Sequence, residues 1–224
     1  MENLQKKRIL MSIAGVILCG ISVGMFKHAS LGVDPFQTLM SGLDAVIPIR
    51  FGTLYVLVNL VLLSAALLLD RRKIGLATFI NLFLLGYIVE WSQAVCVMLL
   101  PGLSGTGRIV LLAAAIILLC LSSSLYFTAD LGVSTYDAVA LIWSERQTRI
   151  PFSICRISTD LICVVLGVLL CRVAGMSWAE VAGSVGIGTV ITAFFMGPLI
   201  TWFNRNVSDP LLKGTQDYNP KQNI

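Results

Sequence analysis

Two similar stretches of this 224-residue chain carry polar residues suited to binding a ligand. The first, LGVDPFQTL, holds Asp34 and Gln37, and the second, LGVSTYDAV, holds Ser134, Thr135 and Asp137. Asp and Ser are preferred helix N-caps, so a helix is predicted to begin after Asp34 and after Ser134. Gln37 and Asp137 have the spacing of a capping box. The positive end of each helix would attract an anion or a carboxylate.

A second set of polar residues lies inside apolar segments, where an ionisable side chain is costly and tends to be kept for pairing or function. Arg156 and Asp160 are four residues apart, hence on one face of a helix. Either they neutralise each other, or Arg156 clamps a substrate and Asp160 is a proton or cation site. Asn59 aligns with Asp160 and either joins the same site or bonds across helices.

The composition places these residues in a membrane. The sequence is 57% apolar and 12% charged, whereas about a quarter of the residues of a soluble domain are charged. Six apolar runs have the length of about 20 residues that crosses a bilayer. They lie at about residues 8–29, 51–69, 74–100, 109–128, 154–173 and 178–203. The predicted fold class is therefore all-α: a polytopic membrane protein with about six transmembrane helices.

The two halves of the chain are similar beyond the two polar stretches. The aligned segments are residues 22–26 with 122–126, residues 31–33 with 131–133, Asn59 with Asp160, and Gly86 with Gly188. Each half, at about 8–100 and 108–203, holds three predicted spans, and an odd number of spans inverts the second half relative to the first. We therefore predict two inverted three-helix repeats in one transmembrane domain, residues 1–203.

Basic residues predict the topology, because short cytoplasmic loops are enriched in Lys and Arg. The cluster KKR precedes the first span at residues 6–8, RRK follows the second at residues 71–73, and further basic residues follow the fourth and sixth. Both termini are therefore expected in the cytoplasm. The polar tail, residues 204–224, is expected to be disordered there.

Each repeat is predicted to hold a short helix after its first span, at residues 34–47 and 134–147. About 14 residues reach about 20 Å, which is too short to cross a bilayer. These helices are either capped linkers at the surface or re-entrant helices whose N-termini dip inward. In transporters built from inverted repeats, short or broken helices in corresponding positions meet a solute near the midplane. The second alternative predicts one solute site between the repeats.

No motif indicates an enzyme. The chain has one histidine, and it lacks a CxxC pair, HExxH, GxSxG and a P-loop. No catalytic residue, metal site or cofactor is expected, and the dispersed basic residues do not predict nucleic-acid binding. The expected partners are the lipid bilayer and an unknown small solute. The function classes that remain are a small-solute transporter, a non-transporting accessory or assembly protein, and a small channel, with a homodimer left open.

The doubled motifs, the positions Asn59 and Asp160, and the closing GSVGIGT at residues 183–189 resemble the YczE/YyaS/YitT family of bacterial integral membrane proteins, closest to its YczE branch. The first half departs from the glycine-rich pattern at NLFLLGY, residues 81–87. The resemblance implies a multi-pass protein of the bacterial cytoplasmic membrane with transport as the suspected activity. It also implies a vitamin-like solute, because similar proteins are often encoded near regulators that use pyridoxal phosphate.

Overall fold

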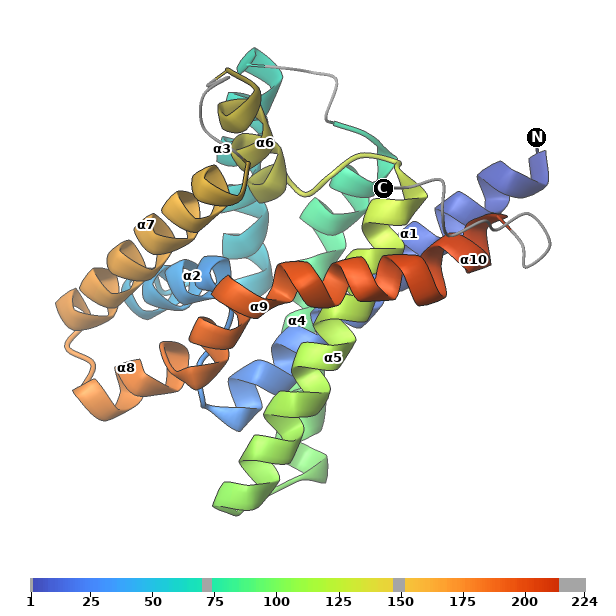
Figure 1. Cartoon of the computed structure of the whole chain (residues 1–224). Helices are drawn as coiled ribbons and strands as arrows, with labels where there is room; N and C mark the ends of the chain where they lie inside the picture. The colour runs from blue at the N-terminus through green and yellow to red at the C-terminus, as the bar shows by residue number, and fades with distance from the viewer. Residues whose placement is uncertain (1, 70–73, 147–151, 214–224) are drawn as a thin grey trace.

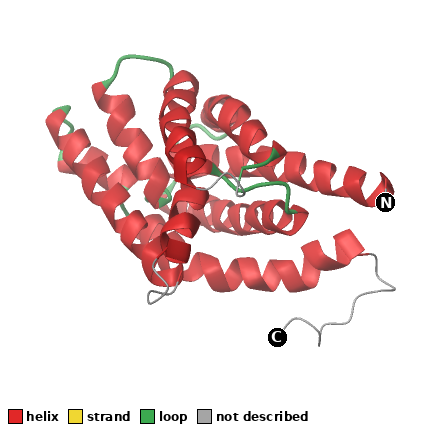
Figure 2. Ribbon diagram, turned by 90° about the horizontal axis from the view of Figure 1, so that it is seen from above, coloured by secondary structure: helices red, strands yellow, loops and turns green. Residues whose placement is uncertain are grey.

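The structure is a computed structural model that describes residues 2–69, 74–146 and 152–213. Within these residues every regular element is helical (Figure 1, Figure 2), which confirms the all-α prediction. The elements are α1 (Glu2–Ala29), α2 (Pro35–Val46), α3 (Phe51–Leu69), α4 (Leu76–Leu99), α5 (Gly105–Ala129), α6 (Thr135–Arg146), α7 (Phe152–Val173), α8 (Trp178–Ser184), α9 (Ile187–Phe203), the π-helical turn η2 (Asn204–Ser208) and α10 (Asp209–Lys213).

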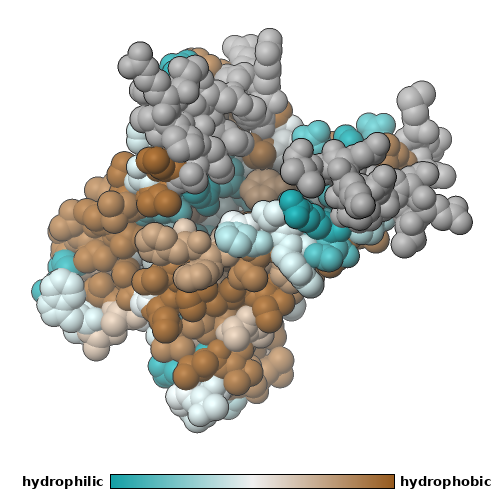
Figure 3. Space-filling model, viewed as in Figure 1, coloured by the Kyte–Doolittle hydropathy of each residue, from teal (hydrophilic) through white to brown (hydrophobic). Residues whose placement is uncertain are grey.

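Six helical segments of the described chain are long and apolar enough to cross a membrane, as the sequence predicts. They are Leu4–Ala29, Phe51–Leu69, Leu76–Leu99, Gly105–Ala129, Ile154–Val173 and Trp178–Leu212. Large apolar side chains are exposed along these segments, and Figure 3 shows apolar residues over much of the left and lower part of the face that it draws. Such a surface is stable against lipid tails and unstable in water, so the chain is an integral membrane protein.

The sixth predicted span, residues 178–203, is not one helix. It breaks between α8 and α9, where Val185 and Gly186 adopt extended backbone conformations. Hydropathy averaged over the length of a span does not mark this break, because residues 178–212 together are apolar enough to cross a membrane. The predicted short helices at 34–47 and 134–147 are present as α2 and α6, and residue 147 lies outside the described residues.

Helix α1 lies at the centre and packs along α4 and α5. Glycines on α1 allow this close approach, because an added Cβ at Gly20 would lie 2.5 Å from the Ile88 side chain of α4 and one at Gly15 would lie 3.0 Å from Ser122 O of α5. Close backbone approach over small residues is the usual packing mode in lipid. A second crossing joins α2 to α7, where Gly42 and Gly167 meet.

The two Leu-Gly-Val loops make matching contacts with the opposite half of the chain. Gly188 N, at the start of α9, donates to Leu31 O over 2.9 Å. Ala77 N, at the start of α4, donates to Leu131 O over 3.0 Å. Each loop therefore joins the third span of the other half, and the two halves are interlocked.

The matching contacts correct the alignment of the third spans. The N-H of Gly75 bonds to Thr78 Oγ1 and that of Gly186 to Thr189 Oγ1, both over 3.2 Å, so equivalent positions lie 111 residues apart. The predicted pairing of Gly86 with Gly188 is wrong, because Gly86 lies against α3 whereas Gly188 lies against the first Leu-Gly-Val loop. Among the described residues, the first half has no helix before its third span that corresponds to α8.

The tail is ordered further than the sequence indicates. After α9 the chain continues through η2 into α10 instead of becoming disordered at residue 204. Ser208 Oγ and Ser124 Oγ of α5 are 2.5 Å apart, and Leu212 is buried against Met11 and Leu125. A buried leucine and a satisfied hydroxyl fix this turn. The rest of the predicted tail, residues 214–224, and the basic cluster at residues 71–73 lie outside the described residues.

Candidate functional site

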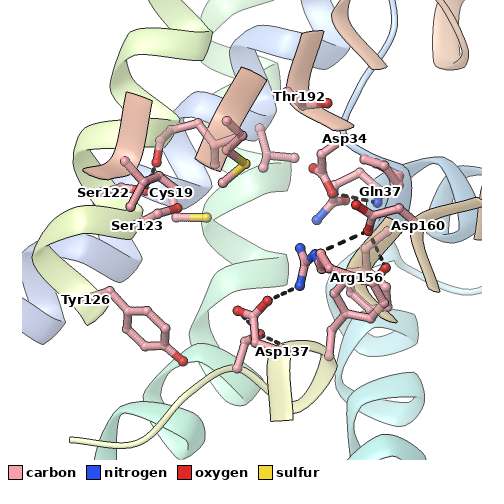
Figure 4. A pocket seen from close by; sticks show the side chains of 18 of the residues that line it. Cys19, Asp34, Gln37, Ser122, Ser123, Tyr126, Asp137, Arg156, Asp160 and Thr192 are labelled. Carbon is pink, nitrogen blue, oxygen red and sulfur yellow. Dashed lines mark hydrogen bonds and ion pairs between the residues drawn. The ribbon is translucent and has the colours of Figure 1, made fainter. Parts of the chain in front are cut away.

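A cavity of about 490 Å³ lies between the two halves and is lined by residues from α1 to α7 and from α9 (Figure 4). This volume falls in the range of small-molecule sites, which are about 300–1,000 Å³. Of the predicted site residues, six line it: Asp34, Gln37, Ser134, Asp137, Arg156 and Asp160. The starts of α2 and α6 therefore face the interior of the protein rather than its surface.

The start of α2 places Asp34 and Gln37 at the cavity. Asp34 caps the helix by accepting a 3.2 Å hydrogen bond from Gln37 N, and Pro35 occupies the first helical position, as predicted. Burial raises the pKa of Asp34 to about 6, against the lowering effect of the Gln37 hydrogen bond. The predicted capping box is not formed, because the side-chain oxygen of Gln37 is buried without a hydrogen-bond partner.

The start of α6 repeats this arrangement with different residues. Ser134 Oγ accepts a hydrogen bond from Asp137 N (3.0 Å) and donates one to Asp137 Oδ2 (2.7 Å). The other carboxylate oxygen of Asp137 accepts from Arg156. Asp137 is thus held by its own helix start and by α7 together.

Arg156 is shared between two carboxylates. Besides Asp137, its guanidinium reaches Asp160, with 3.4 Å between Nε and Oδ1. Tyr136 donates its hydroxyl to the same Asp160 oxygen over 2.5 Å, and its ring lies 4.5 Å from the guanidinium carbon. The sequence predicts the Arg156–Asp160 contact from its i, i+4 spacing. It does not predict Asp137 as a second partner, which requires α6 to pack against α7.

Asn59 and Thr135 do not line the cavity. The hydroxyl of Thr135 donates to the side-chain oxygen of Asn59, whose amide nitrogen donates to Tyr55 O over 2.8 Å. Both side chains are almost fully buried, so this chain of bonds attaches α6 to α3. Of the two alternatives for Asn59, the geometry matches the bond across helices. A direct binding role for these two residues stays a prediction.

Aromatic residues in the cavity wall are missing from the set of site residues predicted from sequence. Phe36 and Tyr136 stack with 4.9 Å between ring centroids, and Tyr55 meets Phe36 edge-on at 6.0 Å. The hydroxyl of Tyr126 is buried without a hydrogen-bond partner. The sequence does contain a signal for the stacked pair, since Phe36 and Tyr136 occupy the same position in the two motifs.

The cavity wall carries more acidic than basic side chains. Its charged residues are Asp34, Asp137 and Asp160 against Arg156. Arg156 already contacts two of the three carboxyl groups, so its single positive charge is shared between two anions of the protein. With all three carboxyl groups ionised, the cavity carries an excess of two negative charges.

The cavity opens between α7 and α9. In the first half α3 packs along α4, whereas the corresponding helices of the second half, α7 and α9, make only slight contact among the described residues. Ile157 of α7 and Phe194 of α9 line the cavity and are also 42% and 61% exposed. Figure 3 shows polar residues in a recess above α9, bordered by apolar surface. The opening is therefore flanked by side chains suited to contact with lipid.

Comparisons with known proteins give relatives without an assigned activity. A family model described as a family of unknown function (DUF6198) matches residues 6–205. The chain is 24% identical over 190 residues to "Uncharacterized protein YyaS" of Bacillus subtilis (strain 168), covering 84% of this chain and 88% of that protein. It is 22% identical over 189 residues to "Uncharacterized membrane protein YczE" of the same organism, covering 84% and 80%.

An uncharacterized protein of Haemophilus influenzae (strain ATCC 51907 / DSM 11121 / KW20 / Rd) is 23% identical over 203 residues, which cover 89% of this chain and 84% of that protein. No solved structure matches the chain. The matches to YyaS and YczE confirm the resemblance seen in the sequence.

Proposed function

Because this chain belongs to DUF6198, a family of unknown function, we propose its role from the geometry of its cavity: a transporter that binds a small solute between the two halves of the molecule. One observation carries the proposal. Charged residues of the α2 cap, α6 and α7 converge on one internal cavity, although each costs free energy at membrane depth.

A transporter and a non-transporting accessory protein are expected to differ in where their polar side chains lie. A transporter has them around an internal cavity. An accessory protein is expected to concentrate polar or aromatic residues on one outer flank, where its partner binds. Here Asp34, Asp137, Arg156 and Asp160 face inward, and the outer surface of the spans is mainly apolar (Figure 3). This arrangement favours the transporter.

The contacts of the Leu-Gly-Val loops support an inverted repeat in the proposed transporter. Each loop is hydrogen-bonded to the third span of the opposite half, as expected for two units related by a pseudo-two-fold axis in the membrane plane. In such proteins one unit rocks against the other around a fixed central site. The opening between α7 and α9, which has no equivalent between α3 and α4, would then be one state of an alternating pair.

We predict a topology in the bacterial cytoplasmic membrane with both termini in the cytoplasm. Cysteines introduced at Ser30 and at Asp130, in a variant that lacks the six natural cysteines, should react with a membrane-impermeant maleimide from opposite sides. In intact cells Ser30 should be labelled, and Asp130 only after lysis. Labelling of both from the same side would contradict the inverted repeat.

A bulky side chain in the cavity should abolish solute binding without unfolding the protein. Gly197 of α9 lines the cavity, and an added Cβ there meets no atom within 4 Å. We expect Gly197→Phe to lower the affinity for any solute of the cavity by about tenfold or more, because its ring would occupy the space. The measurement is a thermal-shift screen of the protein in lipid nanodiscs against small amines, carboxylates and vitamins, followed by uptake of each hit into proteoliposomes.

Gly105→Phe is the matched control for this variant. Gly105 also has no atom within 4 Å of an added Cβ, but it lies at the outer end of α5 and does not line the cavity. It should leave solute binding unchanged. If the hits stabilise both variants as strongly as the wild type, the cavity is not the solute site and the proposal is wrong.

A further inference from the structure

We propose that the cavity binds an organic cation, an ammonium group carried on a small apolar or aromatic body. This inference rests on the proposed function and names the chemical class of its solute. Three independent features of the cavity carry it: its charge balance, its unpaired hydrogen-bond acceptor and its aromatic wall.

The charge balance opposes an anion. A carboxylate solute bound to the remaining N-H groups of Arg156 would be a third anion on one guanidinium, because Asp137 and Asp160 already contact it. It would then lie beside negative groups in a medium where Coulomb interactions are stronger than in water. An ammonium group instead reduces the negative excess and leaves the Arg156 contacts intact. We expect the ammonium group to pair with Asp34, because this carboxyl group of the cavity has no salt bridge among the described residues.

The positive ends of α2 and α6 do not reverse this preference. Helix N-termini attract anions when their N-H groups are free. Here the N-H of Gln37 is bonded to Asp34, and the N-H of Asp137 is bonded to Ser134. At each helix start a side chain of the protein therefore already accepts from one N-H group and competes with an anionic solute.

The cavity also has a hydrogen-bond acceptor that needs a donor. The side-chain oxygen of Gln37 lacks a hydrogen-bond partner, and this residue is only 2% exposed. A buried amide oxygen without a partner is less stable than a satisfied one, so a ligand that donates to it gains affinity. Asp34 and Gln37 lie on the same first turn of α2 (Figure 4). An ammonium group has three donors for such a pair.

The remaining wall suits an apolar or aromatic body. Phe36, Tyr55, Tyr126 and Phe194 line the cavity together with aliphatic side chains such as Leu85. Aromatic faces attract a cation through the ring quadrupole. The opening between α7 and α9 is bordered by Ile157 and Phe194, so an amphipathic amine can enter from the lipid side.

Three probes that share a phenyl ring and differ in charge test the inference: phenethylamine, 2-phenylethanol and phenylacetate. Binding to the protein in nanodiscs is measured by calorimetry at neutral pH and millimolar probe concentration. Phenethylamine should bind at least about tenfold more tightly than 2-phenylethanol, and phenylacetate should bind most weakly. Phenylacetate binding as tightly as phenethylamine overturns the inference, and so does the absence of phenethylamine binding.

The variant Asp34→Asn removes the negative charge of Asp34 and keeps a residue that can cap the helix. Asn caps a helix as well as Asp does, so this variant should fold normally while its affinity for phenethylamine falls at least about tenfold. Asp44→Asn is the control, because Asp44 lies on the same helix, is exposed and does not line the cavity. Gln37→Met is a second variant that removes the side-chain amide and with it the unpaired acceptor. It should weaken phenethylamine and 2-phenylethanol, which can donate to that oxygen, but not phenylacetate. Unchanged phenethylamine affinity in Asp34→Asn overturns the inference.

The affinity should also depend on pH with a defined sign. Phenethylamine stays protonated at neutral and mildly acidic pH, whereas Asp34, with a pKa of about 6 in the free protein, gains a proton as the pH falls. Affinity should therefore drop about tenfold between about pH 7.5 and about pH 5, and it should stay nearly constant in Asp34→Asn. Asp34 interacts electrostatically with titratable groups on three neighbouring helices. They are Arg156, Asp160 and Cys163 of α7, Tyr55 of α3, and Cys19 and Lys27 of α1. Helix α9 has no titratable residue, and Glu180 of α8 lines a separate surface pocket.

The Gly197→Phe variant separates failure of this inference from failure of the proposed function. If phenylacetate is preferred and Gly197→Phe removes its binding, the cavity remains the solute site and only the cation class is wrong. If phenethylamine binds equally to the wild type and to Gly197→Phe, the binding lies elsewhere and both are wrong.

Discussion

Alanine at Gly32 should destabilise the protein by about 3 kcal/mol or more, one of the largest effects expected of any single methyl group in this chain. Gly32 has a φ of +100°, and an added Cβ would lie 2.5 Å from Gly186 N and 2.8 Å from Gly186 Cα. Both are backbone atoms at the start of α9, so relief requires the first Leu-Gly-Val loop to separate from the other half. The measurement is the thermal midpoint and the unfolding free energy in detergent.

Gly175→Ala is the matched control for the backbone strain alone. Gly175 also has a positive φ, +82°, but no atom lies within 4 Å of an added Cβ. Its cost should be limited to the left-handed backbone, about 1–2 kcal/mol. Gly132→Ala, where an added Cβ would meet the Gly75 backbone, should behave like Gly32→Ala. Equal costs at Gly32 and Gly175 would show that the close contact with α9 does not limit stability.

Replacing Arg156 by Met should destabilise the protein by up to about 3–5 kcal/mol, the cost of removing one partner from a fully buried ion pair. Here the side chains of Arg156, Asp137 and Asp160 are 28%, 17% and 8% exposed. The change leaves Asp137 and Asp160 without their shared cation. The combined variant Arg156→Met, Asp137→Asn and Asp160→Asn should recover most of that stability, because replacing a whole buried network is often neutral. The measurement is the yield of monodisperse protein together with its thermal midpoint.

Arg50→Met provides the comparison at the surface. Arg50 pairs with Glu90 over 3.2 Å, but its side chain is 76% exposed, and exposed pairs contribute about 0–1 kcal/mol. If Arg156→Met is no more harmful than Arg50→Met, the cavity is hydrated enough to stabilise the two carboxylates. The combined variant also tests binding. It should be folded yet bind the solute more weakly, because the negative excess of the cavity falls while Asp34 remains, whereas unchanged binding would limit the three residues to a structural role.

Local features of the fold could be read from the sequence because they depend on residues that are close together in the chain. The length and hydropathy of each run determine whether it can cross a bilayer, and this predicted the six spans. Asp34 before Pro35 and Ser134 three residues before Asp137 predicted the starts of α2 and α6, since a cap bonds to its own first turn. The repeated motif and the charges inside an apolar segment also predicted most of the candidate site, since six of the eight predicted residues line the cavity.

Other features depend on how distant helices pack, and only the tertiary structure decided them. Asp137 joins Arg156 because α6 lies against α7, and Thr135 is removed from the cavity because its hydroxyl is used by Asn59 of α3. The break at Gly186 serves the contact with the first Leu-Gly-Val loop. Hydropathy averaged over the length of a span does not detect it, because residues 178–212 together are apolar enough to cross a membrane. Hydropathy and spacing place each charge on its own helix, but the sign of a cavity depends on which charges meet and which are already paired, and that is set by packing across the whole chain.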